Sequence, residues 1–413
     1  MQRKYSKTNT LVLVLALLVI FILGLFWVNL QFAKNNPGGN DFLVHYVGTR
    51  SFLFDGISPY GDEVATRIQV AAYGHPAQGR EHELRVAYPI YSMILFTPFS
   101  LISDYQLSRA IWMTVLELAL VTMTFVSFAL IEWRPPLWVQ GVFLLFSVVW
   151  YHAVRGVING NAVILIALAL VSILLLIKKK RDKAAGVLLA LTTIKPHLVV
   201  LVIPIIVIWS IYHKRWQLIF WFAGTLLGLT LLGMILIPDW IIQNLWEILR
   251  YPAYNPAGTL AAVLGEWIPG ISIQLKWGIG IGLGLVLLYE VWLVRQGSFS
   301  HFVWTTFVTL TLAQWIGIQT DPGNFILLFP ALVLILFEVN QKWSERGGLI
   351  SVITLSTLLV GLWVLFVVTI QHSYQPVQGS VMFIPMPAFC LIGLYWIKWW
   401  FIGSKPLIWN DFS

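Results

Sequence analysis

Two groups of side chains in this sequence have the types and spacing to do chemistry, and the first follows an apolar run near the N-terminus. Asp41 and His45 are four residues apart, so in a helix they lie on one face. There the carboxylate could accept a proton as a general base, with the imidazole beside it. The alternative is that Asp41, which follows Pro37-Gly38-Gly39-Asn40, caps a helix that ends at Asp55-Gly56. Spacing alone leaves both interpretations open.

The second group is cationic and lies near the middle of the chain. Two apolar runs, 184–194 and 198–212, are each too short to cross a bilayer upright, and they meet at Thr193-Ile-Lys-Pro-His197. Because proline breaks a helix, we expect Lys195 at a helix break within the membrane profile. An ammonium there is costly unless it faces a wet cavity or an anion such as phosphate. The alternative is that Lys195 snorkels to lipid headgroups beside a kink.

Polar side chains in two predicted turns extend this group. The segment from Trp150 to Ala162 holds side chains that either line the same cavity or belong to an ordinary turn and helix start. They are His152, Arg155, Asn159 and Asn161. The segment from Gln319 to Phe325 contains Asp321-Pro-Gly, which is typical of a tight turn capped by the aspartate. A role of Asp321 in acceptor binding is the alternative.

Composition sets the class of protein. The 413 residues are 58% hydrophobic and 11% charged, which excludes an ordinary soluble domain and indicates a polytopic membrane protein. The net charge of +8 could indicate a nucleic-acid partner, but the basic residues lie between apolar runs, with no soluble basic domain to hold a duplex. We therefore expect no nucleic acid. The single cysteine excludes an intrachain disulfide.

The apolar runs are the elements that must position the candidate residues. Together with the run that follows Met1–Thr10, they predict an all-α fold of about twelve crossings. We expect residues 1–413 to form a single integral-membrane domain. The remaining runs are roughly 105–131, 137–152, 161–177, 184–194, 198–212, 216–237, 272–294, 301–318, 324–340, 349–370 and 380–402.

Two polar segments between the runs are expected to fold at the membrane surface. The segment 31–104 is too polar to cross and too rich in aromatic residues to be a disordered linker, so a structured loop is predicted. Within it, Tyr88 to Phe99 is apolar but short and bounded by prolines, which suits a re-entrant half-helix. The segment 238–271 combines Trp and Tyr with Pro and Gly, which suits an interfacial cover over a lipid-facing site or a plain aromatic belt.

Charge predicts the orientation in a cell membrane. The cluster Lys178-Lys179-Lys180-Arg181-Asp182-Lys183 belongs on the cytoplasmic side by the positive-inside rule. With that cluster inside, both termini are cytoplasmic, and the loop 31–104, Lys195 and Asp321 are extracytoplasmic. The candidate active site is therefore expected outside the cytoplasm.

Glu117 and Glu290 fall inside predicted spans, where an ionisable side chain is a functional hypothesis by default. Glu290 lies close to the inner end of its span and to Arg295, so we assign it no function. Glu117 is near the middle of its span, and the sequence offers no role for it.

Several short motifs occur in order over about the first half of the chain. They are Asp41-Phe42 with Tyr46, Asp55-Gly56-Ile-Ser-Pro59-Tyr60, Tyr88-Pro89 with Pro98, Gly160-Asn161, and the hairpin from Ala185-Gly186 to Lys195-Pro196. In this order they resemble glycosyltransferase family 87. The resemblance implies a GT-C-type bundle that takes sugar from polyprenyl-phosphate donors, as the mannosyltransferases of lipomannan and phosphatidylinositol mannoside assembly do.

The sequence departs from the family pattern at two places. The family turn more often reads Gly-Gln where this chain has Gly160-Asn161, and a later outer-loop histidine used by some members has no match near Asp321. These departures leave the donor sugar and the acceptor open, although the resemblance favours mannose and a lipid-linked or cell-envelope glycan acceptor.

The resemblance also implies a mechanism. Asp41 matches the first outer-loop aspartate that family members use as general base, so the anomeric centre would be inverted. Lys195, with His197 and Arg155, is expected to stabilise the leaving lipid phosphate without a metal or other cofactor. The remaining substrate-binding candidates are His45, Tyr46, Tyr60, Tyr88, Asn159, Asn161 and Asp321. The outer loops contain no GxGxxG, P-loop or DxD motif, which argues against a nucleotide-sugar donor.

Two other functions compete with this one. A transporter or flippase for a lipid-linked or small anionic substrate fits the broken helix at Lys195-Pro196, but no matching break occurs in the second half of the chain. A lipid-linked-glycan ligase would share the lipid-phosphate chemistry, but its largest folded loop is expected late in the chain rather than first.

Overall fold

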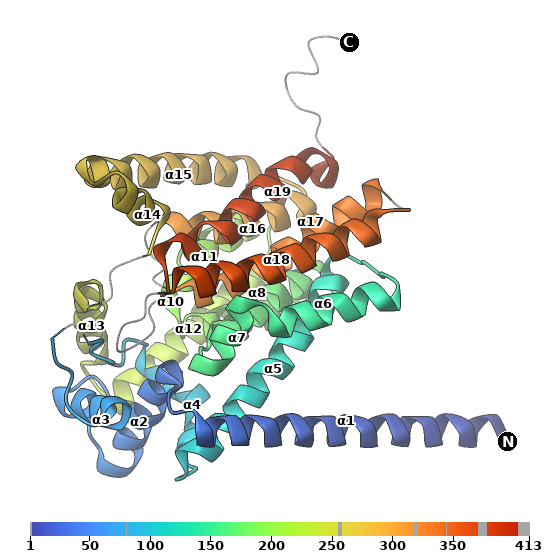
Figure 1. Cartoon of the computed structure of the whole chain (residues 1–413). Coiled ribbons are helices and arrows are strands. Elements are labelled where there is room, and N and C mark those ends of the chain that lie inside the picture. The colour runs from blue at the N-terminus through green and yellow to red at the C-terminus, as the bar shows by residue number, and fades with distance from the viewer. Residues whose placement is uncertain are drawn as a thin grey trace. The chain divides into compact units, whose positions relative to one another are not determined.

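The computed structural model describes residues 2–79, 81–254, 258–316, 321–343, 345–370 and 378–403, and every regular element in these ranges is a helix (Figure 1). The predicted all-α fold is therefore confirmed. Contacts divide the chain into two compact units. The first comprises Met1–Val86, Ser92–Leu118 and Val157–Asn161, and the second comprises Ala87–Tyr91, Ala119–Gly156 and Ala162–Ser413. The expected single domain stays a prediction.

The first unit is built around one aromatic ring. Its helices are α1 (Gln2–Asn35), α2 (Asn40–Asp55), α3 (Asp62–Tyr73), α4 (Met93–Ser100) and the first half of α5 (Tyr105–Leu130). Phe42 of α2 stacks on Tyr105 and Trp112 of α5, with ring centroids 6.0 and 5.5 Å apart. It also meets Phe96 and Phe99 of α4 at 6.4 and 6.3 Å. Aromatic packing thus folds much of the segment 31–104, as its composition predicts.

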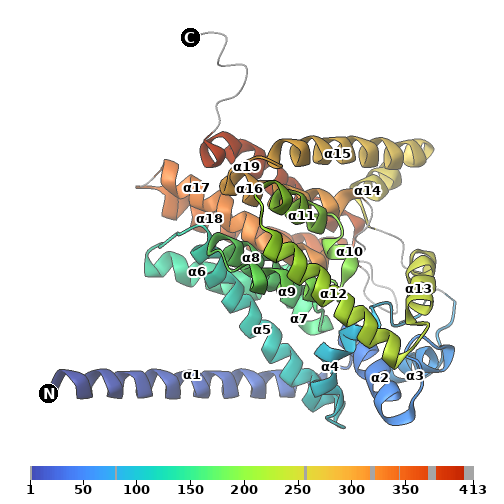
Figure 2. The same cartoon turned by 180° about the vertical axis from the view of Figure 1, so that it is seen from behind.

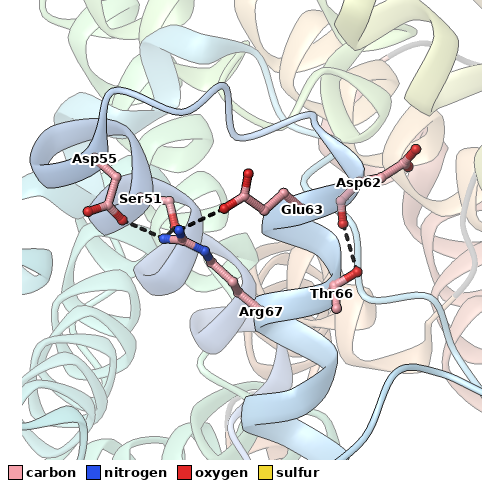
Figure 3. Close-up of polar contacts among 6 residues, drawn as sticks. All are labelled: Ser51, Asp55, Asp62, Glu63, Thr66 and Arg67. Atoms are coloured by element: carbon pink, nitrogen blue, oxygen red, sulfur yellow. Dashed lines mark hydrogen bonds and ion pairs between the residues drawn. The ribbon is translucent and has the colours of Figure 1, made fainter.

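An arginine joins α2 to α3 within this unit (Figure 3). Arg67 of α3 donates to Asp55 at the end of α2, and its other terminal nitrogen donates to Glu63 at 2.8 Å. Figure 3 shows the Asp62 side chain directed away from Arg67. Asp62 pairs instead with Arg85 at 2.8 Å. Because the Arg67 pairs are largely exposed, they fix the register of α2 against α3 more than they stabilise the unit.

The remaining helices belong wholly or mainly to the second unit. They are η1 (Ile90–Ser92), α6 (Leu137–Val149), α7 (Tyr151–Asn159), α8 (Val163–Lys178), α9 (Asp182–Thr192), α10 (Pro196–Val199), α11 (Val202–Tyr212), α12 (Trp216–Leu236), α13 (Trp240–Tyr254), α14 (Leu260–Trp267), η2 (Pro269–Ile271), α15 (Ser272–Val294), α16 (Phe299–Ile316), η3 (Pro322–Leu328), α17 (Phe329–Lys342), α18 (Gly347–Thr369), η4 (Ser380–Phe383) and α19 (Pro385–Ile402).

The core of the second unit is the continuous segment formed by η3 and α17. In its most apolar stretch, 94% of the residues are buried. In the corresponding stretches of α12, α15 and α18, only 11–17% of the residues are buried, so these three helices form the apolar exterior. Helix α9 packs against α12, and the two are labelled next to each other in Figure 2. A Cβ at Gly186 would lie 2.4 Å from the backbone oxygen of Leu218, so the two helices approach closely only because residue 186 is glycine.

The number of crossings differs from the expectation. Among the described residues, seven helices are long and apolar enough to cross a membrane, or eight if α6 and α7, which meet at a 47° bend, form one span. About twelve crossings are therefore not confirmed, because several predicted runs form shorter helices. These are Val163–Lys178 and Val202–Tyr212, together with the 11-residue helix α9. The orientation in the membrane stays a prediction.

The predicted turn between Trp150 and Ala162 is wrong over most of its length. Tyr151–Asn159 is helical, and the turn is confined to Gly160 and the residues that follow. The turn was predicted too long because Asn-Gly-Asn is typical of a turn. The residues before it instead form a helix that follows α6 after a bend. The predicted helix break before Pro196 is confirmed, since α9 ends at Thr192 and α10 begins at Pro196.

Candidate active site

Asp41 lies in the first turn of α2 and is half-buried. The N-cap of this helix is Gly39, in the left-handed conformation with φ 81°, so the interpretation of Asp41 as the N-cap is wrong. The predicted C-terminal end is confirmed, because Gly56 has φ 67° and donates to the last turn. A carboxylate in the first turn is favoured by the helix dipole, which stabilises its ionised form.

The chain just before α2 is held by two side chains of α5. The Tyr105 hydroxyl donates to the Gly38 carbonyl at 2.8 Å, and Arg109 Nη1 donates to the Asn36 carbonyl at 2.7 Å. A Cβ at Gly39 would lie 2.5 Å from Arg109 Nε, so glycine is needed there for space as well as for its φ. The start of α2, and with it Asp41, is therefore positioned by α5.

The Gly160-Asn161 turn belongs to the same arrangement. Arg109 Nη2 donates to the Ile158 carbonyl at 3.0 Å, and Trp112 Nε1 donates to the Gly160 carbonyl at 2.8 Å. Gly160 has φ 71°, and a Cβ there would lie 2.5 Å from the Cβ of Phe42. Asn161 is buried and Asn159 is half-buried at the end of α7. The glycine of this motif is thus explained by close packing on α2.

Gly160→Ala should therefore cost more stability than a left-handed alanine alone. We expect the free energy of unfolding to fall by about 3 kcal/mol or more, because backbone strain and overpacking act together. Thermal unfolding in detergent measures this loss. Gly56→Ala is the matched control, because Gly56 has φ 67° with no atom near its Cβ position. It should cost only about 1–2 kcal/mol, and an equal cost for both variants would contradict the packing explanation.

Three predicted substrate-binding residues of the first unit are buried in it. His45 is buried and stacks on Phe96, with ring centroids 4.4 Å apart. The Tyr46 hydroxyl donates to the Ile102 carbonyl at 2.7 Å. Burial raises the pKa of Tyr46 above its usual value, so this hydroxyl remains a donor. Tyr60 is buried, and its carbonyl accepts from Arg85 at 3.2 Å. Substrate contact by these residues stays a prediction.

Lys195 lies at the helix break in the second unit. It is the N-cap residue of α10, and only 5% of its surface is exposed. Its Nζ lies 3.4 Å from Asn324 Oδ1 and 5.6 Å from the centre of the Tyr88 ring. A snorkelling lysine keeps its ammonium in water, so this burial disfavours the headgroup alternative. The ammonium is held by an amide oxygen and an aromatic face.

Arg155 and Asp321 form a bidentate pair that the sequence did not predict. Arg155 Nε lies 3.0 Å from Asp321 Oδ1, and Nη2 lies 2.8 Å from Oδ2. Asp321 also accepts from the Gly323 N–H, which confirms the predicted cap of the turn. Burial acts to raise the pKa of Asp321, but the charge and hydrogen bonds of Arg155, helped by Lys195, lower it below its usual range. The carboxylate is therefore ionised at neutral pH.

The structure brings most of the predicted cationic group together. Lys195, Arg155 and Asp321 belong to the second unit, and the charge of Lys195 acts on Asp321. His197 follows Lys195 in α10 and is half-buried. The charges of Arg155 and Lys195 both act on the Asp321 carboxylate. His152 is fully buried between the rings of Trp150 and Phe325.

Two other aspartates of the first unit are held by arginines. Asp55 pairs with Arg67 at the far end of α2 from Asp41, and Asp62 pairs with Arg85. Fourteen residues of helix separate Asp41 from Asp55, which is about 21 Å along the axis. Within the described ranges, no three His, Cys, Asp or Glu side chains gather as a metal-binding group. Metal independence stays a prediction that needs an assay.

Glu117 and Glu290, which lie in predicted spans, have partners far away in the sequence. Glu117 accepts from the Asn29 amide at 2.7 Å. Glu290 is buried and pairs with buried Lys398 at 2.7 and 2.9 Å, so its partner is Lys398 rather than Arg295. Breaking such a pair leaves an uncompensated buried charge, so Glu290 is explained as structural.

Three residues with defined contacts were missed from the sequence: Arg109 and Asn324, which contact the candidate groups, and Lys398, which pairs with Glu290. A signal existed for Arg109 and Lys398, because each is a cation within a predicted apolar run, where a charge is rarely unpaired. Asn324 gave no signal, since an asparagine after Pro-Gly is ordinary in a turn.

The chain was compared with protein families, curated proteins and solved structures. The model of glycosyltransferase family 87 matches residues 87–316. No curated protein and no solved structure matches the chain. The matched region contains Tyr88, Arg155 and Lys195, whereas Asp41 and Asp321 lie outside it.

Proposed function

The chain belongs to glycosyltransferase family 87, and on that premise we propose that it is an inverting enzyme using a polyprenyl-phosphate sugar donor. Family membership makes the protein a glycosyltransferase and sets aside the transporter alternative. We further propose that the transferred sugar is mannose and that the acceptor is a lipid-linked or cell-envelope glycan. The transfer takes place on the extracytoplasmic side of the membrane.

The proposed reaction is a single displacement. A hydroxyl oxygen of the acceptor attacks the anomeric carbon, and the bond from that carbon to the phosphate oxygen breaks with inversion. Asp41 takes the hydroxyl proton, and the lipid phosphate leaves with the bonding electron pair. Lys195 stabilises the charge that grows on the leaving phosphate, with Arg155 and His197 nearby.

The observation that carries the proposal is the buried ammonium of Lys195 at a helix break within the family-matched region. A buried cation at such a break is costly unless an anion compensates part of its desolvation. A lipid phosphate supplies that anion. Its polyprenyl chain stays in the bilayer while the sugar projects from it, which suits a protein built from apolar helices.

The residues around Lys195 suit a phosphate better than a neutral sugar. Asn324 and the Tyr88 ring contact the ammonium without cancelling its charge. The pairing of Arg155 with Asp321 balances the second cation.

The direct test is sugar transfer by the purified full chain in detergent. A synthetic polyprenyl-phosphate mannose and an acceptor extract from cell envelope are mixed with the protein, and the glycolipid products are analysed by mass spectrometry. Transfer from this donor with an inverted anomeric centre supports the proposal. Transfer from a nucleotide sugar but not from the lipid donor would overturn it.

Activity should survive removal of divalent cations. A lipid monophosphate can be stabilised by fixed protein cations, whereas a nucleotide diphosphate leaving group usually needs a metal. Excess EDTA should therefore change the transfer rate by less than about twofold. Loss of activity that added magnesium or manganese restores would contradict the metal-free mechanism and make Asp41 a candidate ligand.

A further inference from the structure

Two basic turns of the second unit are tied together into one face. The first turn joins α8 to α9, and the second joins α11 to α12. Arg215 of the second turn donates from Nε to the Asp182 carboxylate at 2.9 Å and from Nη2 to the Ile177 carbonyl at 2.8 Å. Since α9 also packs against α12, the two turns have a fixed arrangement.

Five cations of this face are exposed and form no ion pair with a described residue. Their neighbours are paired, Lys178 with Glu132 at 3.0 Å and Arg215 with Asp182. The five, which we call the basic patch, are Lys179, Lys180, Arg181, Lys183 and Lys214. Exposed charges of one sign that lie close together create a potential that attracts anions.

The basic patch lies at the start of a helix with an apolar exterior. Helix α12 begins at Trp216, directly after Lys214 and Arg215, and only 11% of the residues in its most apolar stretch are buried. Trp216, Phe220 and Trp221 in its first turns are exposed. In a membrane, acyl chains cover such a helix, so the headgroups of the same lipids lie at its end, beside the basic patch.

Lys183 connects the basic patch to this apolar surface. Its Nζ lies 6.0 Å from the centre of the Trp221 ring. A cation next to an exposed aromatic side chain can contact a lipid headgroup while the ring contacts the acyl chain below it. The basic patch thus has both surfaces that an anionic lipid needs.

We infer that the basic patch binds the headgroups of anionic phospholipids in the adjoining leaflet. The positive-inside rule accounts for the sign of the charge at this end, but not for two turns joined into one face beside a lipid-covered helix. The inference is independent of the proposed function. Lys195 follows the opposite end of α9, whose 11 residues span about 16 Å.

Two lysines of the basic patch can be removed while the turns are kept. Lys180 and Lys214 have φ 56° and 55°, and each takes the position after a helix that glycine most often occupies. The next residue in each turn, Arg181 or Arg215, donates its N–H to the last helical turn at 2.8 Å. Glycine adopts this conformation without strain, so Lys180→Gly with Lys214→Gly should not lower the unfolding temperature.

The test measures binding of fluorescently labelled phosphatidylglycerol and phosphatidylcholine to the full chain in detergent, by fluorescence anisotropy. Wild type should bind phosphatidylglycerol more tightly. The double glycine variant should weaken that binding about 25-fold, because each lysine near anionic lipid contributes about fivefold in affinity. Its affinity for phosphatidylcholine should change by less than about twofold. Equal affinities of wild type for the two lipids, or unchanged phosphatidylglycerol binding by the variant, would overturn the inference.

Glu132→Gly is the matched control for the backbone change. Glu132 also has a positive φ, 58°, and its exposed side chain pairs with Lys178. This variant removes a negative charge, so phosphatidylglycerol binding should not weaken. A loss as large as that of the lysine variant would contradict a role of charge. Lys183→Gln, within α9, should weaken the binding about fivefold and keeps the test open if the glycine variant fails to fold.

Two further measurements identify the bound group and its place. Inorganic phosphate should not displace phosphatidylglycerol more than sodium chloride does at matched ionic strength, because it has no acyl chains to lie along α12. Specific displacement by phosphate would assign the basic patch to a soluble anion and overturn the inference. Lys195→Met should keep the preference for phosphatidylglycerol. Loss of that preference would place the lipid at Lys195 instead of at the basic patch.

Discussion

Asp41→Asn is expected to lower kcat for sugar transfer by a factor of about 100 to 10,000, which is the usual contribution of a general base. Asparagine keeps the shape of the side chain but cannot take a proton from the acceptor hydroxyl. The fold should survive, because the N-cap of α2 is Gly39 and not residue 41. Loss of the favourable charge at the helix N-terminus should cost at most about 1 kcal/mol.

The control for this variant lies in the same helix. Asp55→Asn changes the last residue of α2 and removes an exposed pair with Arg67, which should cost at most about 1 kcal/mol of stability. Its kcat should stay close to that of wild type. Initial rates with saturating donor and acceptor, measured together with unfolding temperatures, separate the two variants. Near-wild-type turnover by Asp41→Asn would remove Asp41 from catalysis.

Helix positions were the most predictable part of this protein. The run 216–237 became α12 (Trp216–Leu236), and the run 349–370 became α18 (Gly347–Thr369), because uninterrupted apolar stretches of this length have few alternatives to a helix. The break before Pro196 was also predictable, since proline cannot continue a helix without losing a hydrogen bond. Helix α7 was missed because its turn motif dominated the local pattern.

Pairing between distant residues could not be read from the sequence. Arg155 and Asp321 are 166 positions apart, and Lys195 and Asn324 are 129 apart. Each of these residues suggested a local role, as a turn residue, a cap or a kink. Their contacts depend on how η3 enters the core of the second unit, which no local spacing specifies.

The role of Gly39 shows a similar limit. Pro-Gly-Gly before an aspartate indicates a helix start, and the local sequence offered the aspartate as the cap. Packing requires a glycine at position 39, because Arg109 and Tyr105 of α5 fill the place where a side chain there would lie. The partner helix therefore selects the start of α2 and leaves Asp41 in the first turn for another role.

Lys195→Met is expected to lower kcat/KM for the lipid donor about 100-fold or more, in the range found when one group that stabilises a developing negative charge is removed. Methionine keeps the length and the apolar character of the lysine stem, and its sulfur packs well against an aromatic ring such as Tyr88. The buried position should therefore accept it without loss of fold. Donor concentration series at fixed acceptor, with unfolding temperatures, measure both effects.

Lys398→Met is expected to have the opposite effect, a loss of stability rather than a specific loss of donor use. Lys398 is also a buried lysine of the second unit, and it pairs with the buried carboxylate Glu290. Removing it leaves that charge unpaired and should cost about 3–5 kcal/mol of stability. Lys195→Met should thus lose activity and keep stability, whereas Lys398→Met should lose stability first. Unchanged donor affinity and rate in Lys195→Met would show that its ammonium takes no part in phosphate binding.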